Sequence, residues 1–374
     1  MSKPELNDLR RLVVKIGSSL LTDPEGRLDR GWLQSLADDV AELRQGGREI
    51  LIVSSGAVAV GSEVLGIDRH RARLEGLQAA AAAGQVQLVH AYQEALAKHG
   101  IRAAQVLLTP DDTEVKRRFL NARGTLEKLL EHDVVPVINE NDTVATDELR
   151  YGDNDRLAAR VAQTVMADGL VLLSDVDGFY SKDPRTDSSA EFISMLTSID
   201  DEHIAMAGGS GSAMGSGGMA TKLQAAKIAT HAGCATIIAS GVDAHPLRSL
   251  AGGARHTLFT APESPKAARK QWLAGVLDVR GELSLDDGAV DALRNGKSLL
   301  PVGLVGVSGT FRRGDAVSIK CKNGGELGRG LAAYSSDEAT AIKGCRSDQI
   351  ETVLGYRGRS VLVHRDDMVL FDTK

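Results

Sequence analysis

The sequence predicts an α/β protein: a mainly parallel, open sheet between two layers of helices in an αβα sandwich, followed by a small β-rich barrel domain. Two observations predict the first part. Short apolar segments alternate with longer helical patterns through the first two thirds of the 374-residue chain, and the apolar segments are nearly continuous, as in strands buried on both faces. A third observation predicts the second part: after Thr260 the chain changes to short alternating segments separated by glycines.

The expected strands of the first part are short and mostly apolar. They are Leu12–Ile16, Glu49–Val53, Ala104–Leu108, Val134–Ile138, Leu170–Leu173 and Thr236–Ala239. The longer segments between them have apolar residues at helical spacing. The expected helices are Trp32–Arg44, Leu77–Lys98, Leu120–Glu131, Arg156–Met166 and Thr221–His231.

The boundary between the two parts is expected just after Thr260. The segment 261–270, APESPKAARK, contains two prolines and a basic cluster, which is typical of a linker. We therefore expect a first domain at 1–262, a linker at 263–275 and a second domain at 276–374. Strands of the second domain are expected at Val317–Lys320, Gly330–Tyr334 and Val361–His364.

Charge, cysteine content and hydrophobicity restrict the class of protein. The chain has 44 Lys and Arg against 50 Asp and Glu, a net charge of −6, which argues against nucleic acid as a partner of the whole protein. Its three cysteines lie far apart without a CxxC pair, which favours reduced thiols in a cytoplasmic protein. The N-terminal residues do not form an apolar signal segment, and no apolar run has the length of a membrane span.

The most informative stretch runs from Val134 to Arg160. Its apolar strand breaks into Asn139–Asp142, and Gly152–Asp155 then leads into a helical pattern. Parallel sheets bind ligands at the carboxyl ends of their strands, and acids and amides there suit an ammonium group, or Mg²⁺ held through water. The alternative is a solvated loop that caps the helix at Asn154 or Asp155.

Every expected strand of the first domain ends in small or polar residues. These ends are Lys15–Ser19, Ser54–Ala57, Thr109–Asp112, Asn139–Asp142, Ser174–Gly178 and Ser240–Gly241. One polar strand end carries little information, but six in register predict a single crevice along one edge of the sheet.

Two lysines in this pattern are candidates for binding phosphate. Lys15 lies in an apolar strand, where a cation is costly to bury without an anion, and Gly17 follows it. The glycine-rich segment Gly208–Lys222 leads into a helix, whose N-terminal N–H groups and dipole attract anions. The alternatives are a lysine that reaches solvent along its methylenes and a flexible linker.

Other nucleotide and metal motifs are incomplete in the sequence. A Walker A loop would need glycine at Asp291, ahead of Gly296–Ser298. Gly215, Gly217 and Ala220 have a Rossmann spacing, but no strand precedes them. The sequence has no HExxH motif and no paired Cys/His set, so no protein ligand to a metal is assigned.

Six motifs resemble the glutamate 5-kinases of the amino acid kinase superfamily. They are Val14–Ser19, Val53–Val58, Phe119–Arg123, Val137–Asp142, Gly152–Asp155 and Gly217–Lys222. The C-terminal part, which ends in Val363–Met368, resembles the PUA domain appended to that family. The resemblance covers nearly the whole chain. It implies ATP-dependent phosphorylation of the γ-carboxylate of L-glutamate to γ-glutamyl 5-phosphate, the first step of proline biosynthesis.

The resemblance also implies roles for particular residues. Lys15 and Lys222 would be catalytic and contact the nucleotide phosphates, and Asp155 would orient both lysines. The residues expected to hold glutamate are Ser55, Asp142 and Asn154. The residues expected to bind ATP are Lys15, Gly17, Ser174, Asp175, Ser216, Gly217, Gly218, Met219, Ala220, Thr221 and Lys222. Ser174 and Ser216 are threonine in some relatives, and the hydroxyl is kept.

The expected cofactors are ATP and Mg²⁺, with the metal held mostly by ATP phosphates and water. The resemblance further implies a homo-oligomer, a dimer or tetramer, with feedback inhibition by proline. One alternative is another superfamily member that acts on a different carboxylate, a carbamate or a nucleoside monophosphate. The other is RNA binding through the PUA-like domain, for which the local basic residues are Lys266, Arg269, Lys270, Arg312 and Arg313.

Overall fold

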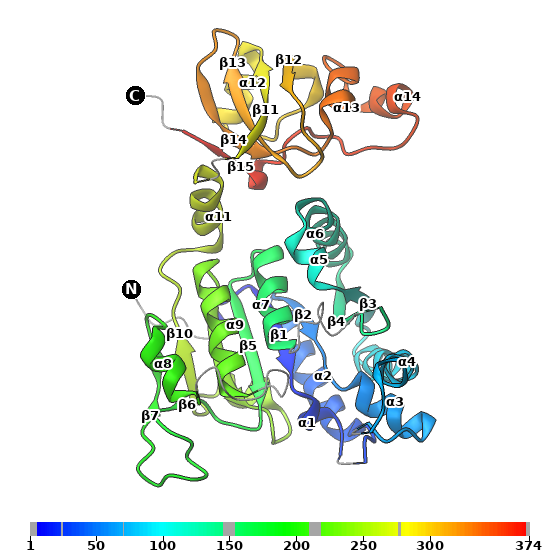
Figure 1. The fold of residues 1–374 in the computed structure, drawn as a ribbon, viewed down its shortest axis with the longest axis vertical. Coiled ribbons are helices and arrows are strands. Elements are labelled where there is room, and N and C mark those ends of the chain that lie inside the picture. The colour runs from blue at the N-terminus through cyan, green and yellow to red at the C-terminus, as the bar shows by residue number, and fades with distance from the viewer. Residues whose placement is uncertain are drawn as a thin grey trace. The chain divides into compact units, whose positions relative to one another are not determined.

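The computed structural model describes residues 6–23, 25–69, 71–144, 154–208, 218–275 and 278–371. By its internal contacts the chain divides into two compact units. The first unit comprises residues 1–114 and 121–265, and the second comprises residues 115–120 and 266–374. Figure 1 shows the sheet and the helices of each unit.

The first unit is built on an eight-stranded sheet (Figure 1). In spatial order its strands are β3 (Arg102–Leu108), β4 (Val134–Glu140), β2 (Glu49–Val53), β1 (Arg11–Ile16), β5 (Gly169–Ser174), β9 (Ala235–Ser240), β10 (His256–Phe259) and β8 (Met195–Leu196). The strands from β3 to β9 are parallel to one another, whereas β10 runs antiparallel to β9. The carboxyl ends of the parallel strands therefore lie along one edge of the sheet.

Helices cover both faces of this sheet (Figure 1). One face packs against α2 (Arg30–Gln45) and α4 (Leu74–Ala97), and the other against α7 (Asn154–Thr164) and α9 (Met219–His231). The remaining expected helix is α6 (Lys116–Glu131). The predicted αβα sandwich is confirmed, with element ends that differ from the sequence prediction by a few residues.

The central strand β1 shows why its middle residues, Leu12–Val14, are all apolar. Leu12 and Val14 of β1 belong to the hydrophobic core that contains α2 and α4. Val13 belongs to the core that contains α7 and α9. Successive side chains of a strand point to opposite faces, so a strand covered on both faces needs an apolar residue at every position.

Helix α3 (Ala57–Leu65), which the sequence analysis does not predict, packs against α4 through two glycines. A Cβ on Gly61 would lie 1.7 Å from the carbonyl oxygen of Ala80, and a Cβ on Gly84 would lie 1.9 Å from that of Ala57. Neither position has room for a side chain, so the two helices approach each other through bare backbone. This approach fixes the start of α3 at the carboxyl edge of the sheet.

The second unit contains a five-stranded sheet. In spatial order its strands are β12 (Leu304–Gly309), β11 (Val279–Leu285), β13 (Ala316–Cys321), β14 (Glu326–Leu331) and β15 (Met368–Leu370). Its helices include α11 (Pro265–Ala274), which occupies most of the expected linker, α12 (Asp287–Arg294), α13 (Ser336–Ala341) and α14 (Ile350–Leu354). The expected β-rich second part is confirmed, although no strand pair in the part that the structure describes closes the sheet into a barrel.

Two expected strands of the second part are wrong. β14 ends at Leu331, so most of the expected strand Gly330–Tyr334 lies beyond it. The segment Val361–His364 makes one isolated bridge, between Val363 and Leu299. Both segments are apolar because they fill the core of the unit and not because they pair in the sheet.

We expect Gly84→Ala to destabilise the first unit. The added methyl group must displace the carbonyl group of Ala57 or push α3 away from α4, an overpacking cost of about 1–3 kcal/mol. Urea unfolding measures the change. The control is Gly76→Ala on the same helix, where the new Cβ would meet the Cβ of Ala72 at 3.4 Å and should leave stability unchanged or raise it. Equal stability of the two variants would contradict the close helix approach.

Candidate functional site

A cavity of about 1200 Å³ lies at the carboxyl edge of the first sheet. Its walls include the ends of β1, β2, β4 and β5 and the starts of α3, α7 and α9. The polar end of β9, Ser240–Gly241, is not part of the wall, and neither is that of β3. The end of β3 stabilises its own turn instead, since Thr109 donates from N and Oγ1 to Asp112 Oδ2 at 2.7 Å. The cavity is therefore formed by the carboxyl ends of the middle strands β1, β2, β4 and β5, and not by those of β3 and β9.

Three buried charged side chains meet at this cavity and form a lysine–aspartate triad (Lys15, Asp155 and Lys222). Lys15 Nζ lies 2.5 Å from Asp155 Oδ1, and Lys222 Nζ lies 3.0 Å from Asp155 Oδ2. Lys15 is near the end of β1, while Asp155 and Lys222 lie in the first turns of α7 and α9. The exposed fractions of the three residues are 4%, 0% and 3%. Both lysines line the cavity, and Asp155 lies behind them.

The triad has one more positive charge than negative charge. Burial by itself would raise the pKa of Asp155, but the charges of Lys15 and Lys222 outweigh it and hold that pKa below its ordinary value. Asp155 is therefore ionised at neutral pH and is shared between the two lysines. Two ammonium groups lie at the wall of the cavity, where they favour an anionic ligand.

An amide network fixes the neighbouring part of the wall. Asn154 Nδ2 donates to the carbonyl oxygen of Ser54 at 2.7 Å, to Ser55 Oγ at 2.9 Å and to Asn139 Oδ1 at 2.9 Å. Asn139 Nδ2 in turn donates to Gln85 Oε1 at 2.8 Å, in the interior of α4. The side chains of Ser55 and Asn154 are therefore held by β2, β4 and α4 together. This buried network of hydrogen bonds favours one arrangement of these side chains.

Most of the residues that the sequence singled out lie around this one cavity. The predicted substrate residues Ser55, Asp142 and Asn154 line it, as do the predicted nucleotide residues Lys15, Gly17, Ser174, Asp175, Gly218, Met219 and Lys222. Ala220 is buried within α9, and Thr221 Oγ1 donates to the carbonyl oxygen of Gly218 at 2.7 Å, so these two support the start of the helix. Ser216 and Gly217 lie outside the described residues.

Sequence reasoning missed several residues of the cavity wall. Among them are Arg69, Tyr180, Lys182 and Arg185. Lys182 and Arg185 follow Tyr180 in the loop of a hairpin, β6 (Phe179–Tyr180) with β7 (Phe192–Ile193). Strands of two residues leave no hydrophobic period to detect. The available signal was the basic residues that follow the polar end of β5.

The described acidic residues of the cavity wall are Glu140, Asp142, Asp175 and Asp183. In the described part of the chain, no three His, Cys, Asp or Glu side chains are grouped so as to hold a metal ion. None of the described helices is long and apolar enough to cross a membrane.

Two family models match this chain. The model of the amino acid kinase family matches residues 10–240, which is more than half of the chain. The model of the PUA domain matches residues 281–354.

The chain is also similar to curated proteins along nearly its whole length. A glutamate 5-kinase of Paramagnetospirillum magneticum is 56% identical over 362 residues, which cover 96% of this chain and 98% of that protein. One of Rhodospirillum rubrum is 55% identical and covers 96% of each chain, and one of Rhodopseudomonas palustris is 52% identical and covers 99% of each. A solved UMP kinase of Ureaplasma parvum aligns with 67% of this chain and 98% of its own, at 16% identity and a TM-score of 0.48.

We expect Asp155→Asn to destabilise the first unit by about 3–5 kcal/mol, because the buried carboxylate that contacts both lysines is then lost. Urea unfolding at neutral pH measures the loss. The control is Asp201→Asn, an exposed aspartate in the first turn of α8 (Asp201–Met206), which should cost no more than about 0.5 kcal/mol. A variant as stable as the wild type would show that the lysines do not depend on Asp155.

The pH dependence of the wild type should follow from the same pair of contacts. The pKa of Asp155 is lowered in the folded protein, so its stabilising effect is fully present above the ordinary value of about 3.9 and is lost as the pH falls through the lowered value. The stability difference between the wild type and Asp155→Asn should therefore be constant across neutral pH and shrink in acid. A difference that shrinks near pH 7 would contradict the assignment.

Proposed function

This chain belongs to the amino acid kinase family and, within it, to the glutamate 5-kinases, and from that premise we propose how its cavity transfers a phosphoryl group from ATP to L-glutamate. The acceptor is the γ-carboxylate of glutamate, and the product is γ-glutamyl 5-phosphate, the first intermediate on the way to proline. The observation that carries the proposal is the pair of buried lysines that contact Asp155 and line the cavity.

The phosphates of ATP would lie against the triad. Lys15 and Lys222 present two ammonium groups to the cavity, and Asp155 keeps both in place. Gly218 precedes α9 and offers no side chain to cap it, so the first N–H groups of that helix are available to a phosphate. Gly17 lets a ligand approach the backbone closely beyond β1. Ser174 and Asp175 would contact another part of the nucleotide from the end of β5.

Glutamate would lie beside Ser55, Asp142 and Asn154. The carboxylate of Asp142 suits the substrate ammonium group, and the hydroxyl and amide of the other two suit its carboxylates. Helix α3 begins after Gly56, whose φ of 93° favours glycine, and no side chain caps its N-terminus. Because Gly56 and Ala57 line the cavity, the start of α3 is a further group that would attract a substrate carboxylate.

The transfer itself needs positioning more than proton movement. An oxygen of the γ-carboxylate attacks the γ-phosphorus of ATP, the bond from that phosphorus to the bridging oxygen breaks, and ADP leaves with the electron pair. The free carboxyl group has a pKa of about 4.3, so it is ionised at neutral pH and requires no general base. The main barrier is repulsion between an anionic nucleophile and a polyanionic triphosphate, which two lysines and a helix N-terminus reduce.

Mg²⁺ is proposed as the second cofactor. When bound, it would neutralise part of the triphosphate charge and hold the phosphates in one conformation. Glu140, Asp142 and Asp175 line the cavity and would hold the ion through its water molecules, as Mg²⁺ prefers. Asp155 is fully buried between two lysines, which argues against it as a direct metal ligand.

Other expectations from the family resemblance stay predictions for this chain. They are a homo-oligomer, feedback inhibition by proline and a cytoplasmic location. The proposed division at residues 262–276 assigns all the chemistry to the first part, because the cavity is lined by residues 15–222.

The proposed reaction is tested by ADP release with four acceptors: glutamate, aspartate, N-acetylglutamate and UMP. Hydroxylamine traps an acyl phosphate as a hydroxamate, so it reports phosphorylation of a carboxylate directly. We expect ADP and hydroxamate in equal amounts with glutamate, and neither product with the other three acceptors. Turnover with UMP or N-acetylglutamate in place of glutamate would overturn the substrate assignment.

We expect Lys15→Ala and Lys222→Ala each to lower kcat by about 10²–10³-fold with a smaller effect on the KM for glutamate, since each removes a cation from the transferred group. The control is Lys227→Ala, five positions further along α9 and outside the cavity wall. Steady-state kinetics with both substrates measure the effect. Near wild-type kcat in either variant would remove that lysine from the proposed mechanism.

A further inference from the structure

The second unit has a cavity of its own, with a volume of about 1090 Å³. Six arginines line this arginine pocket: Arg117, Arg280, Arg312, Arg313, Arg357 and Arg359. Arg117 lies at the start of α6, in the segment 115–120 of the second unit, and Arg280 lies in β11. Arg312 and Arg313 lie in the turn before β13, and the last two follow α14. Four separate parts of the chain therefore bring guanidinium groups to one depression. An accidental patch of surface arginines would not need guanidinium groups from so many parts of the chain to point into one pocket.

The acidic residues of the pocket leave most of this charge uncompensated. Asp278 pairs with Arg280, with 2.7 Å between its Oδ2 and Nη2. Asp315 accepts the backbone N–H of Arg312 at 2.8 Å. Glu338 accepts the backbone N–H of Ser335 at 2.9 Å and the hydroxyl of Tyr356 at 2.7 Å. These carboxylates are thus directed at backbone and hydroxyl groups, except the one that pairs with Arg280.

Only Arg280, among the six arginines, forms an ion pair within the described part of the chain. No carboxylate there forms an ion pair with the side chains of Arg117, Arg312, Arg313 or Arg357. Arg359 donates from Nη2 to the carbonyl oxygen of Leu120, a neutral group of the same unit, at 2.9 Å. Guanidinium groups that converge without carboxylates repel one another. A bound anion would remove that repulsion.

Arg313 shows most clearly that the empty pocket costs free energy. Its Nε is buried and finds no acceptor among the described residues. Burial, and then the charge of Arg359, lower the pKa of Arg313 below its ordinary value. A buried donor without an acceptor costs free energy in the ligand-free protein, and such costs are typical of functional sites. The planar guanidinium group of Arg313 is suited to donate two hydrogen bonds to two oxygens of one phosphate or carboxylate group.

The other residues of the pocket wall indicate which groups the ligand has besides an anionic one. Tyr356 is 47% exposed and its hydroxyl donates to Glu338, so it offers an aromatic surface held beside the arginines. Tyr334 is buried and donates to the carbonyl oxygen of Arg359, which fixes that arginine's backbone. The volume is that of a small-molecule pocket. A long nucleic-acid footprint is also disfavoured by the net charge of −6.

We propose that the arginine pocket of the second unit binds a small phosphorylated molecule, with Arg313 and Arg357 as its principal contacts. The ligand class is a phosphate or pyrophosphate group, with or without an attached ring. The reaction in the first unit consumes and produces phosphorylated compounds, so ligands of this class are present wherever the protein acts. The pocket is a second anion site, distinct in its residues from the triad.

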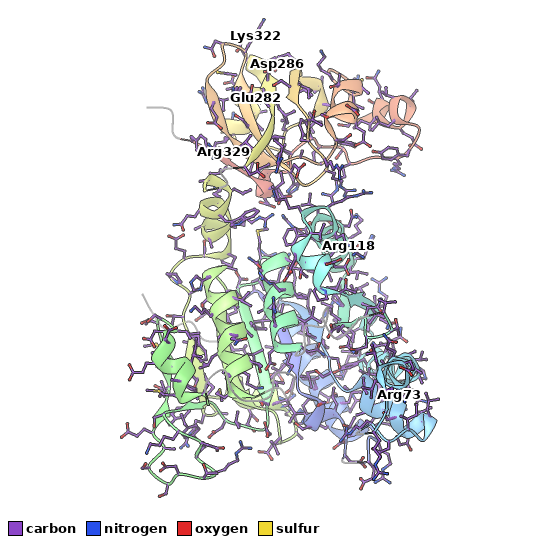
Figure 2. All side chains as sticks on the ribbon, in the orientation of Figure 1. Arg73, Arg118, Glu282, Asp286, Lys322 and Arg329 are labelled. Carbon is purple, nitrogen blue, oxygen red and sulfur yellow. The ribbon has the colours of Figure 1, made fainter. Side chains whose placement is uncertain are left out.

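The test is isothermal titration calorimetry of inorganic pyrophosphate into the full chain. The first cavity also binds phosphate groups, so we expect two classes of site in the wild type. In the double variant Arg313→Gln with Arg357→Gln, one class should remain and the other should weaken by about tenfold or more, because two charge-assisted contacts are lost. The KM for ATP should not change. The control Lys322→Gln removes one charge from the β13–β14 turn of the same unit, where Figure 2 labels the side chain, and should keep both classes.

Several results would overturn the proposal. A wild type with one class of site, or a double variant that keeps both, would show that the arginines do not bind phosphate. If the double variant unfolds, Arg313→Lys keeps the charge but loses the planar guanidinium group, and unchanged pyrophosphate binding by that folded variant would contradict the assignment. A labelled oligouridylate that binds more tightly than pyrophosphate, and is lost in the same double variant, would make the pocket an RNA site instead.

Discussion

One aspartate between two lysines is the interaction on which the rest of this structure depends. Asp155 joins the end of β1 to the starts of α7 and α9, so three distant parts of the sequence are fixed around one carboxylate. A carboxylate in the first turn of α7 is favourable to that helix dipole, whereas Lys222 in the first turn of α9 is not. The arrangement therefore keeps an unfavourable cation where a phosphate would lie. The sheet, the glycine-packed helices α3 and α4 and the amide network all support the walls of this cavity at the carboxyl edge of the sheet.

The first unit was predictable because its signals are local and strong. Leu12, Val13 and Val14 of β1 are consecutive apolar residues because Val13 and Val14 pack on opposite faces, and this predicts a strand in a sheet that helices cover on both faces. Helix α3 was missed because its apolar and small residues follow β2 closely and its packing depends on Gly84, far away in sequence. In the second unit, Val361–His364 is apolar for core packing, and a short apolar segment does not distinguish that from strand pairing.

The residues of the site also divide into those that a local sequence signal reveals and those that depend on contacts between distant parts of the chain. Lys15 in an apolar strand and Lys222 at a helix start were each unusual enough to be noticed alone, and a parallel sheet brings strand ends and helix starts together by topology. The link between Gln85 and Asn139 has no such signal, because a glutamine in the middle of a helix is an ordinary surface residue until the fold places it beneath β4. Contacts of this kind depend on the register between helix and sheet, which sequence patterns do not determine.

The central claim is that Lys222 is kept as a buried cation at the cavity for its ligand, at a cost to the empty protein. The most direct measurement is the free energy of urea unfolding of the ligand-free Lys222→Met variant. Removing this lysine leaves the contact between Asp155 and Lys15 in place and replaces a buried cation by an apolar side chain of similar length. The account predicts that the variant is at least as stable as the wild type, while ATP no longer raises its stability. A ligand-free variant that is less stable by several kcal/mol would mean that Lys222 is a structural partner of Asp155 and not a cation reserved for phosphate.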